Sequence, residues 1–179
     1  LISFANNLSG SIPEAYGQCD SLQRVRLHSN RLSGFVPDNM WGLPRLNIIE
    51  LYDNYLGGTI SSSHLSNAIQ LETLKISSNS FTGELPDSIG LLAQLQVLDV
   101  SGNRLYGNIP QTLQNCHALL EISLQDNGFT GFVPDNFGTL TTLQRMDLSG
   151  NQLTGGIPAS LANLGLLSRL NLSHNHLSG

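Results

Sequence analysis

A short frame of hydrophobic and polar positions recurs along the whole chain. In most copies, apolar residues stand five and three positions before an asparagine, and polar residues alternate with them, as in Val25-Arg26-Leu27. Such alternation over a few residues predicts a short strand with one buried face. The asparagines are spaced by 24 residues, with one step of 25, and stand at positions 6, 30, 54, 79, 103, 127, 151 and 175.

The positions after each asparagine keep the same period. Apolar, glycine and proline residues follow at set distances, as in Leu153-Thr-Gly-Gly-Ile-Pro158. The glycine permits a close backbone approach, and the proline suits an extended segment that donates no hydrogen bond. Apolar residues three apart, such as Ile89 and Leu92, predict a short helical turn farther along. The third copy departs from the frame, because Ser61 replaces the proline and one residue is inserted before Leu71.

A single copy cannot bury its apolar face, so the copies are expected to stack and to pair their strands. The asparagine amide is expected to bond backbone groups in the turn after each strand. We therefore predict an α/β solenoid: a right-handed horseshoe with a parallel concave sheet and short 3-10 or helical turns on the convex side. About eight repeats form one domain over residues 1–179. Absent terminal caps predict poor solubility of this segment alone.

Composition and charge exclude several classes of function. The formal net charge is −5, and no basic run is present, so nucleic-acid binding is not expected. No apolar run approaches the roughly 20 residues that span a bilayer, so we expect no membrane contact by this segment. His174 and His176 have no third ligand beside them, so no metal is expected. No motif indicates a cofactor or an enzyme.

The two cysteines, Cys19 and Cys116, occupy the same position of the frame four copies apart. At the usual strand spacing they lie about 19 Å from each other, whereas a disulfide requires α-carbons within about 7 Å. We therefore expect two free, buried thiols that pack as small hydrophobic side chains.

Stacking places equivalent positions of successive strands side by side, and the early copies carry the most varied outward residues. Phe4, His28 and Tyr52 are neighbours on a face where a scaffold needs no aromatic side chain. Arg24 and Arg26 point the same way from one strand and can fork one carboxylate. An alternative for Arg26 is a ladder of surface ion pairs, because the same column continues with Glu50, Lys75 and Asp99.

The frame resembles the plant-specific class of leucine-rich repeats, through segments such as Leu8-Ser-Gly-Ser-Ile-Pro13. A narrower resemblance is carried by Cys19-Asp-Ser-Leu-Gln-Arg-Val-Arg-Leu27, by Phe35-Val-Pro-Asp-Asn-Met-Trp-Gly-Leu-Pro-Arg-Leu46 and by Ile49-Glu-Leu51. These stretches are similar to HAESA-type and related peptide-hormone receptor kinases. In that family, an Arg-x-Arg pair receives the C-terminal carboxylate of a secreted peptide, and a short-ectodomain co-receptor kinase docks nearby.

The resemblance implies the C-terminal half of an extracellular ectodomain at the plasma membrane, with any kinase domain outside this chain. It implies a peptide-binding concave face; the expected ligand-binding residues are Arg24, Arg26, His28, Glu50, Tyr52, Asp53 and Phe4. Asn7 and Asn171 begin glycosylation sequons, which matter only in a secreted chain. The alternative is a receptor-like protein or wall-enzyme inhibitor that binds folded protein surfaces.

Overall fold

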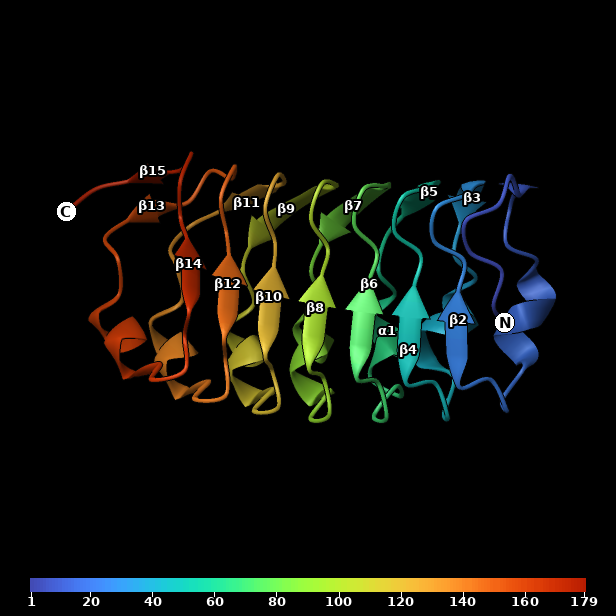
Figure 1. The fold of residues 1–179 in the computed structure, drawn as a ribbon, viewed down its shortest axis with the longest axis horizontal. Helices are drawn as coiled ribbons and strands as arrows, with labels where there is room; N and C mark the ends of the chain where they lie inside the picture. Colours follow the sequence, from blue (N-terminus) through green and yellow to red (C-terminus); the bar gives the residue numbers. More distant parts are fainter.

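The computed structural model describes all 179 residues as a stack of similar coils arranged side by side (Figure 1). One short strand from each coil after the first enters a parallel sheet of seven strands, in the order β14-β12-β10-β8-β6-β4-β2, and the first coil adds an isolated bridge from Ile2 to Arg26. We call this sheet the concave sheet. Its strands are β2 (Arg24–Arg26), β4 (Ile48–Glu50), β6 (Thr73–Lys75), β8 (Val97–Asp99), β10 (Glu121–Ser123), β12 (Arg145–Asp147) and β14 (Arg169–Asn171).

The strands β2 to β12 of the concave sheet follow the predicted alternation. The central residue is buried, as with Val25 in β2 and Ile49 in β4, while the flanking residues point outward. In β14 the central residue, Leu170, is 39% exposed. The register pairs equivalent positions, so that Arg26 lies opposite Glu50 and Glu50 opposite Lys75. The predicted columns of outward residues are therefore confirmed.

The recurring asparagine links each coil to the one before it. The Nδ2 group of Asn54 donates to the carbonyl of Leu51 in its own coil and to that of Leu27 in the preceding coil, both at 3.0 Å. Its Oδ1 accepts a hydrogen bond of 2.9 Å from the N–H of Leu32, again in the preceding coil. Asn30, Asn79, Asn103, Asn127, Asn151 and Asn175 repeat this pattern. The predicted role of the asparagine is confirmed, and its bonds also join neighbouring coils.

The residue before each of these asparagines has a left-handed backbone. Its φ is 54° at Ser29, 57° at Asp53 and 60° at Gly102. Asp and Gly tolerate this conformation better than most residues. The whole set is Ala5, Ser29, Asp53, Ser78, Gly102, Asp126, Gly150 and His174. Residues at this position therefore have a backbone role whatever their side chains do.

A second parallel sheet, which the sequence analysis did not predict, runs along the upper edge of the stack in Figure 1. We call it the edge sheet. It corrects the expectation that the coils form a single parallel sheet. Only one residue in a typical strand is buried, as with Leu32 in β3, so the pattern shows no clear alternation. Its strands are β1 (Ser9–Gly10), β3 (Arg31–Phe35), β5 (Tyr55–Gly58), β7 (Ser80–Glu84), β9 (Arg104–Asn108) and β11 (Gly128–Thr130), with a separate pair β13 (Thr154–Gly155) and β15 (His176–Leu177).

Short helical turns form the side opposite the concave sheet, as predicted. Proline precedes each 3-10 helix in an extended conformation, for example Pro86 with φ −73° and ψ 145°. The 3-10 helices are η1 (Glu14–Gln18), η2 (Asp38–Gly42), η3 (Asp87–Leu91), η4 (Gln111–Asn115), η5 (Asp135–Thr139) and η6 (Ala159–Asn163). The irregular third coil instead forms one α-helical turn, α1 (Ser62–Leu65), where Ser61 replaces the proline.

The apolar residues between the two sheets and the helical turns form one continuous core. Cys116 belongs to this core, and burial raises the pKa of its thiol to about 11. Cys19 is only half-buried, which corrects the expectation that both thiols are enclosed. Both thiols are free. None of the helices has the length and hydrophobicity needed to cross a bilayer.

Candidate functional site

The first two strands of the concave sheet bring the predicted arginines to one surface. Arg24 begins β2 and is exposed, and its side chain makes no ion pair. Arg26 ends the same strand and points to the same side, because it is two residues farther along. The residue opposite Arg24 in β4 is Ile48, which offers no countercharge. The two arginines therefore share one face of β2, and the only acid opposite them in β4 is Glu50, which pairs with Arg26.

Arg26 forms a close ion pair with the acid opposite it, Glu50. Its Nε lies 3.0 Å from Oε2 of Glu50, but this N–H finds no acceptor in hydrogen-bonding geometry. The two side chains are 33% and 18% exposed, so the pair is partly withdrawn from water. The outcome for the proposed ion-pair ladder is mixed: the first pair forms, whereas Lys75 makes no ion pair with Glu50 or Asp99.

A continuous stack of three aromatic rings flanks the arginines. The rings of Phe4 and His28 are 4.6 Å apart and 11° from parallel. Those of His28 and Tyr52 are 4.3 Å apart and 9° from parallel. Each ring comes from a different coil, so the stack crosses the coils at right angles to the strands. The sequence predicted that these three residues are neighbours, and the structure confirms it.

The environment of Tyr52 links the stack to the charged residues. Partial burial, followed by the nearby carboxylates of Glu50 and Asp53, raises the pKa of its phenol, while Arg26 lowers it. Its hydroxyl is therefore protonated near neutral pH and can donate a hydrogen bond.

Two further residues complete the description of this surface. Asp53 is exposed at the left-handed position before Asn54, so its presence has a backbone explanation besides any contact with a ligand. Ile2 is 57% exposed and lies opposite Arg26 through an isolated bridge, next to Phe4. Ile2 stands four residues before Asn6, as Arg26 does before Asn30, and it was not among the predicted site residues. Its apolar character at an outward position was the signal.

The chemistry of the surface changes at the next coils. Ser77 is buried, and its hydroxyl donates to Oδ2 of Asp99 at 2.8 Å. The other oxygen of Asp99 accepts bonds from the N–H and hydroxyl of Ser101. These polar groups satisfy one another. The arginines and the aromatic stack therefore end where a self-contained polar network begins.

The two sequons differ in accessibility. Asn7 is exposed and lies before β1. Asn171 is half-buried in β14, where its Nδ2 donates to Asp147 at 3.0 Å and to Ser149 at 3.1 Å. A glycan on Asn171 would remove at least one of these bonds, because it replaces a hydrogen of this nitrogen.

Comparison with known proteins places the fold in a family. A model of a leucine-rich repeat region matches residues 13–178. The ectodomain of the Arabidopsis receptor kinase HAESA, solved with the peptide hormone IDA and the co-receptor SERK1, is 41% identical over 100% of this chain, with a TM-score of 0.78. The ectodomain of GASSHO1/SCHENGEN3 from Arabidopsis thaliana, solved with CASPARIAN STRIP INTEGRITY FACTOR 2, is 37% identical over 96% of the chain, with a TM-score of 0.93.

A third similar structure, PEPR1 with AtPEP1, is 35% identical over 100% of the chain, with a TM-score of 0.95. The chain spans 34% of the HAESA chain, 20% of the GASSHO1 chain and 25% of the PEPR1 chain. No curated protein sequence matches it. The repeat frame, the coil geometry and these matches agree, and the chain belongs to the leucine-rich repeat family, with plant receptor kinase ectodomains among its structural neighbours.

Proposed function

We propose that this chain is the extracellular part of a plant receptor-like kinase that recognises a secreted peptide on its concave sheet. HAESA, GASSHO1/SCHENGEN3 and PEPR1 were each solved with a peptide or protein ligand, and they share this fold at 35–41% identity. The whole receptor's activity would depend on segments beyond the matched share of those chains.

The pair of guanidinium groups on β2 carries this proposal. Arg24 has no ion-pair partner, and Arg26 has one acid that fails to form a directed hydrogen bond. Arginine side chains two residues apart on a strand point to the same side. A terminal carboxylate has two oxygens and fits two such donors, which form strong charge-assisted hydrogen bonds. We infer that Arg24 and Arg26 receive the C-terminal carboxylate of the peptide.

The surroundings of the arginines suit the last residues of a peptide. The stack formed by Phe4, His28 and Tyr52 offers a wide, rigid apolar wall beside the charged groups. Asp53 provides an acceptor for backbone N–H groups, while Glu50 lies against Arg26. A co-receptor kinase, such as the SERK1 partner seen with HAESA, would then dock close to the peptide end.

The proposal is tested by calorimetry on the ectodomain that contains this chain. IDA and AtPEP1 serve as first probes, each with a free and an amidated C-terminus. We expect a peptide that binds to lose about 10- to 100-fold in affinity on amidation, since hydrogen bonds to charged groups contribute about 1.5–3 kcal/mol. Arg24→Ala and Arg26→Ala should each weaken the free form to a similar degree.

Arg31→Ala is the matched control, because Arg31 is an exposed arginine on the edge sheet and should leave binding unchanged. Tight binding that ignores both amidation and the two concave substitutions would remove the carboxylate model. Binding to a folded wall enzyme, without any peptide, would support the alternative of an inhibitor or receptor-like protein.

A further inference from the structure

An identical segment occurs twice on the side of the stack that faces away from the concave sheet. Gly-Phe-Val-Pro-Asp-Asn stands at residues 34–39 and again at residues 131–136, four coils apart. Its phenylalanines, Phe35 and Phe132, are 70% and 71% exposed, which makes them the most exposed large hydrophobic residues of the chain. Other coils carry Ser11, Thr59, Glu84, Asn108 and Gly156 at this position. The fold therefore does not need an aromatic ring there.

Both rings rest against a glycine of the following coil. A β-carbon at Gly58 would lie 2.7 Å from Cδ1 of Phe35, and one at Gly155 would lie 2.6 Å from Cδ1 of Phe132. Both glycines also have positive φ angles, of 84° and 76°. The absence of a side chain lets one edge of each ring rest on the next coil while the remainder stays in solvent.

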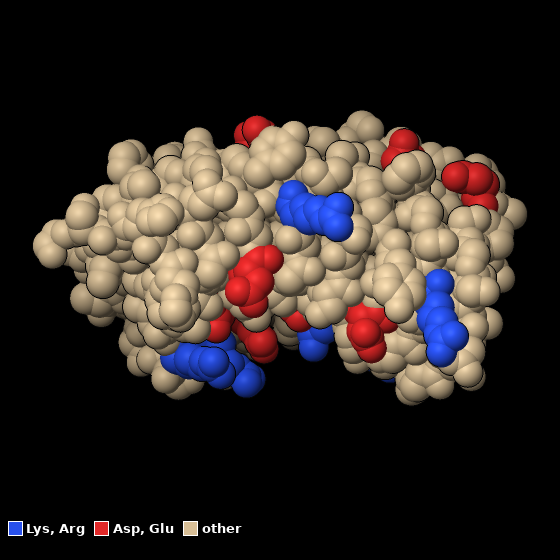
Figure 2. All heavy atoms as spheres, turned by 90° about the horizontal axis from the view of Figure 1, so that it is seen from above, with Lys and Arg blue, Asp and Glu red and all other residues tan.

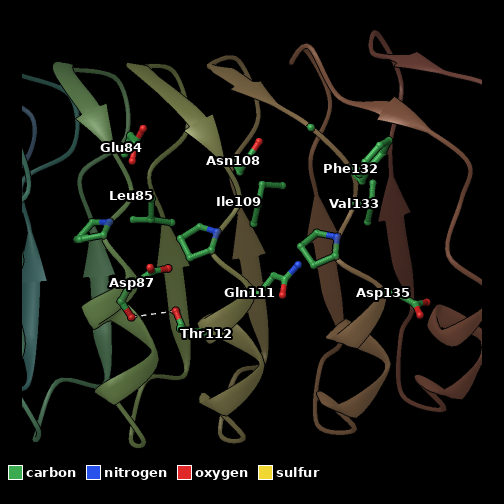
Figure 3. Close-up of a pocket in the computed structure, with 14 residues that line it drawn as sticks. Glu84, Leu85, Asp87, Asn108, Ile109, Gln111, Thr112, Phe132, Val133 and Asp135 are labelled. Atoms are coloured by element: carbon green, nitrogen blue, oxygen red, sulfur yellow. Dashed lines mark hydrogen bonds between the residues drawn. The ribbon is translucent and has the colours of Figure 1, made fainter.

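Each ring borders an acidic groove. The groove beside Phe132 has a volume of about 1040 Å³ and runs between two rows of side chains above and below the buried Leu85, Ile109 and Val133 (Figure 3). The groove beside Phe35 has a volume of about 380 Å³. Neither is lined by a Lys, Arg or His. The acidic residues are Glu84, Asp87 and Asp135 in the first groove and Glu14 and Asp38 in the second.

The carboxylates of these grooves form no ion pair or side-chain hydrogen bond. An acid in the first turn of a helix is favoured by the helix dipole, which accounts for Asp38 and Asp135 individually. That effect gives no reason for an exposed ring three residues earlier in both segments. Figure 2 shows acidic side chains along the top rim of its view and basic side chains elsewhere on the same face; Arg31 and Arg104 belong to the edge sheet but line neither groove.

We propose that this flank binds a basic, extended segment of a partner protein, with one Arg or Lys side chain at each Phe–Asp pair. In the larger groove the ring and the carboxylate lie on opposite sides, so a long cationic side chain that crosses the groove can reach both, and both interactions favour it. Four coils separate the two pairs, which corresponds to about 19 Å at the usual strand spacing. An extended chain covers that distance in about six residues. This surface is separate from the concave sheet, so the inference stands without the proposed peptide site.

The test uses surface plasmon resonance with the immobilised protein at low ionic strength. The probe is the amidated peptide Arg-Gly-Ser-Gly-Ser-Gly-Arg. We expect it to bind about tenfold more tightly than a probe with one arginine replaced by alanine, since the second contact becomes intramolecular. Phe35→Ala or Phe132→Ala should reduce its affinity to that of the one-arginine probe, and Asp38→Asn or Asp135→Asn should act in the same direction.

Tyr106→Ala is the matched control, because Tyr106 is 52% exposed on the same sheet and lines neither groove. It should not change binding, and neither should Arg24→Ala. Absence of binding, equal binding of the one- and two-arginine probes, or indifference to the phenylalanine and aspartate substitutions would overturn the proposal. A probe with leucine in place of both arginines that bound as tightly would show an apolar partner and would also overturn it.

Discussion

Glu50 forms an ion pair with Arg26, the residue that we also propose as a ligand for the peptide carboxylate. Its Oε2 lies 3.0 Å from the Nε of Arg26 across the first two strands of the concave sheet, yet the contact lacks hydrogen-bonding geometry. A ligand carboxylate that approaches Arg26 would find Glu50 close by, but without a well-aligned hydrogen bond from the Nε–H group of Arg26. Glu50 would then compete with the ligand for Arg26.

Replacing Glu50 by Gln should therefore strengthen the binding of a peptide with a free C-terminus. We expect a gain of about twofold to fivefold, since partly exposed ion pairs contribute about 0.2–1 kcal/mol. Calorimetry measures the change. Glu121→Gln is the control, because Glu121 forms the equivalent but longer contact of 3.7 Å with Arg145 farther along the sheet. A large loss of affinity in Glu50→Gln would instead show that Glu50 contacts the ligand directly.

Asn151 should be among the residues on which folding stability depends most. Its Nδ2 donates to the carbonyls of Leu124 and Leu148, and its Oδ1 accepts from the N–H of Phe129, all buried. Asn151→Ala is expected to lower the free energy of unfolding by about 3 kcal/mol or more, since each unpaired buried group costs about 1–3 kcal/mol. Urea denaturation followed by circular dichroism measures this.

Asn163→Ala serves as the control for this experiment. Asn163 is exposed at the end of η6, and its side chain makes no hydrogen bond, so its loss should change stability by less than about 0.5 kcal/mol. Similar effects of the two substitutions would contradict the structural role of the recurring asparagine.

Two adjacent glycines of β5 should respond differently to the same substitution. Gly58 has a φ of 84°, and a β-carbon there would meet Phe35, whereas Gly57 has no positive φ and its nearest neighbour would be 3.5 Å away. Gly58→Ala is expected to cost about 1–2 kcal/mol from the backbone alone, and Gly57→Ala far less. Thermal melts compare them. In a Phe35→Ala background, the cost of Gly58→Ala should fall, and an unchanged cost would show that the ring moves aside freely.

The sequence predicted the fold more completely than the candidate site. The period located the strands of the concave sheet and the recurring asparagines, because both depend on spacing. The edge sheet was not predicted, because a strand such as β3 buries only Leu32 and exposes its other residues, so no alternation marks it. The columns placed Arg26 beside Glu50, but spacing could not show that their contact is misdirected or that Lys75 stays unpaired. Such details depend on side-chain rotamers, which a repeat pattern does not determine.

The two cysteines should differ sharply in reactivity. Burial raises the pKa of Cys116 to about 11, so only about one thiol in a thousand is ionised at pH 8, and its sulfur is enclosed. Cys19 is half-buried. Iodoacetamide on the native protein at pH 8 should label Cys19 alone, as read by peptide mass spectrometry, and both residues in urea. Labelling of Cys116 in the native protein would indicate local opening of the fourth and fifth coils.

The recurring asparagine forms its bonds between coils only with the preceding coil, so the two ends of a shortened array would lack different hydrogen-bond partners. Each asparagine reaches back: the amide of Asn54 meets Leu27 and Leu32, which precede it. Removing a preceding coil would leave the asparagine amide without its partners in that coil, whereas removing a following coil would leave several main-chain N–H groups without acceptors, among them those of Leu27, Ser29 and Leu32. An engineer who trims or splices such arrays would therefore supply a carbonyl and an N–H for the asparagine amide at the start, and acceptors for a row of main-chain N–H groups at the finish.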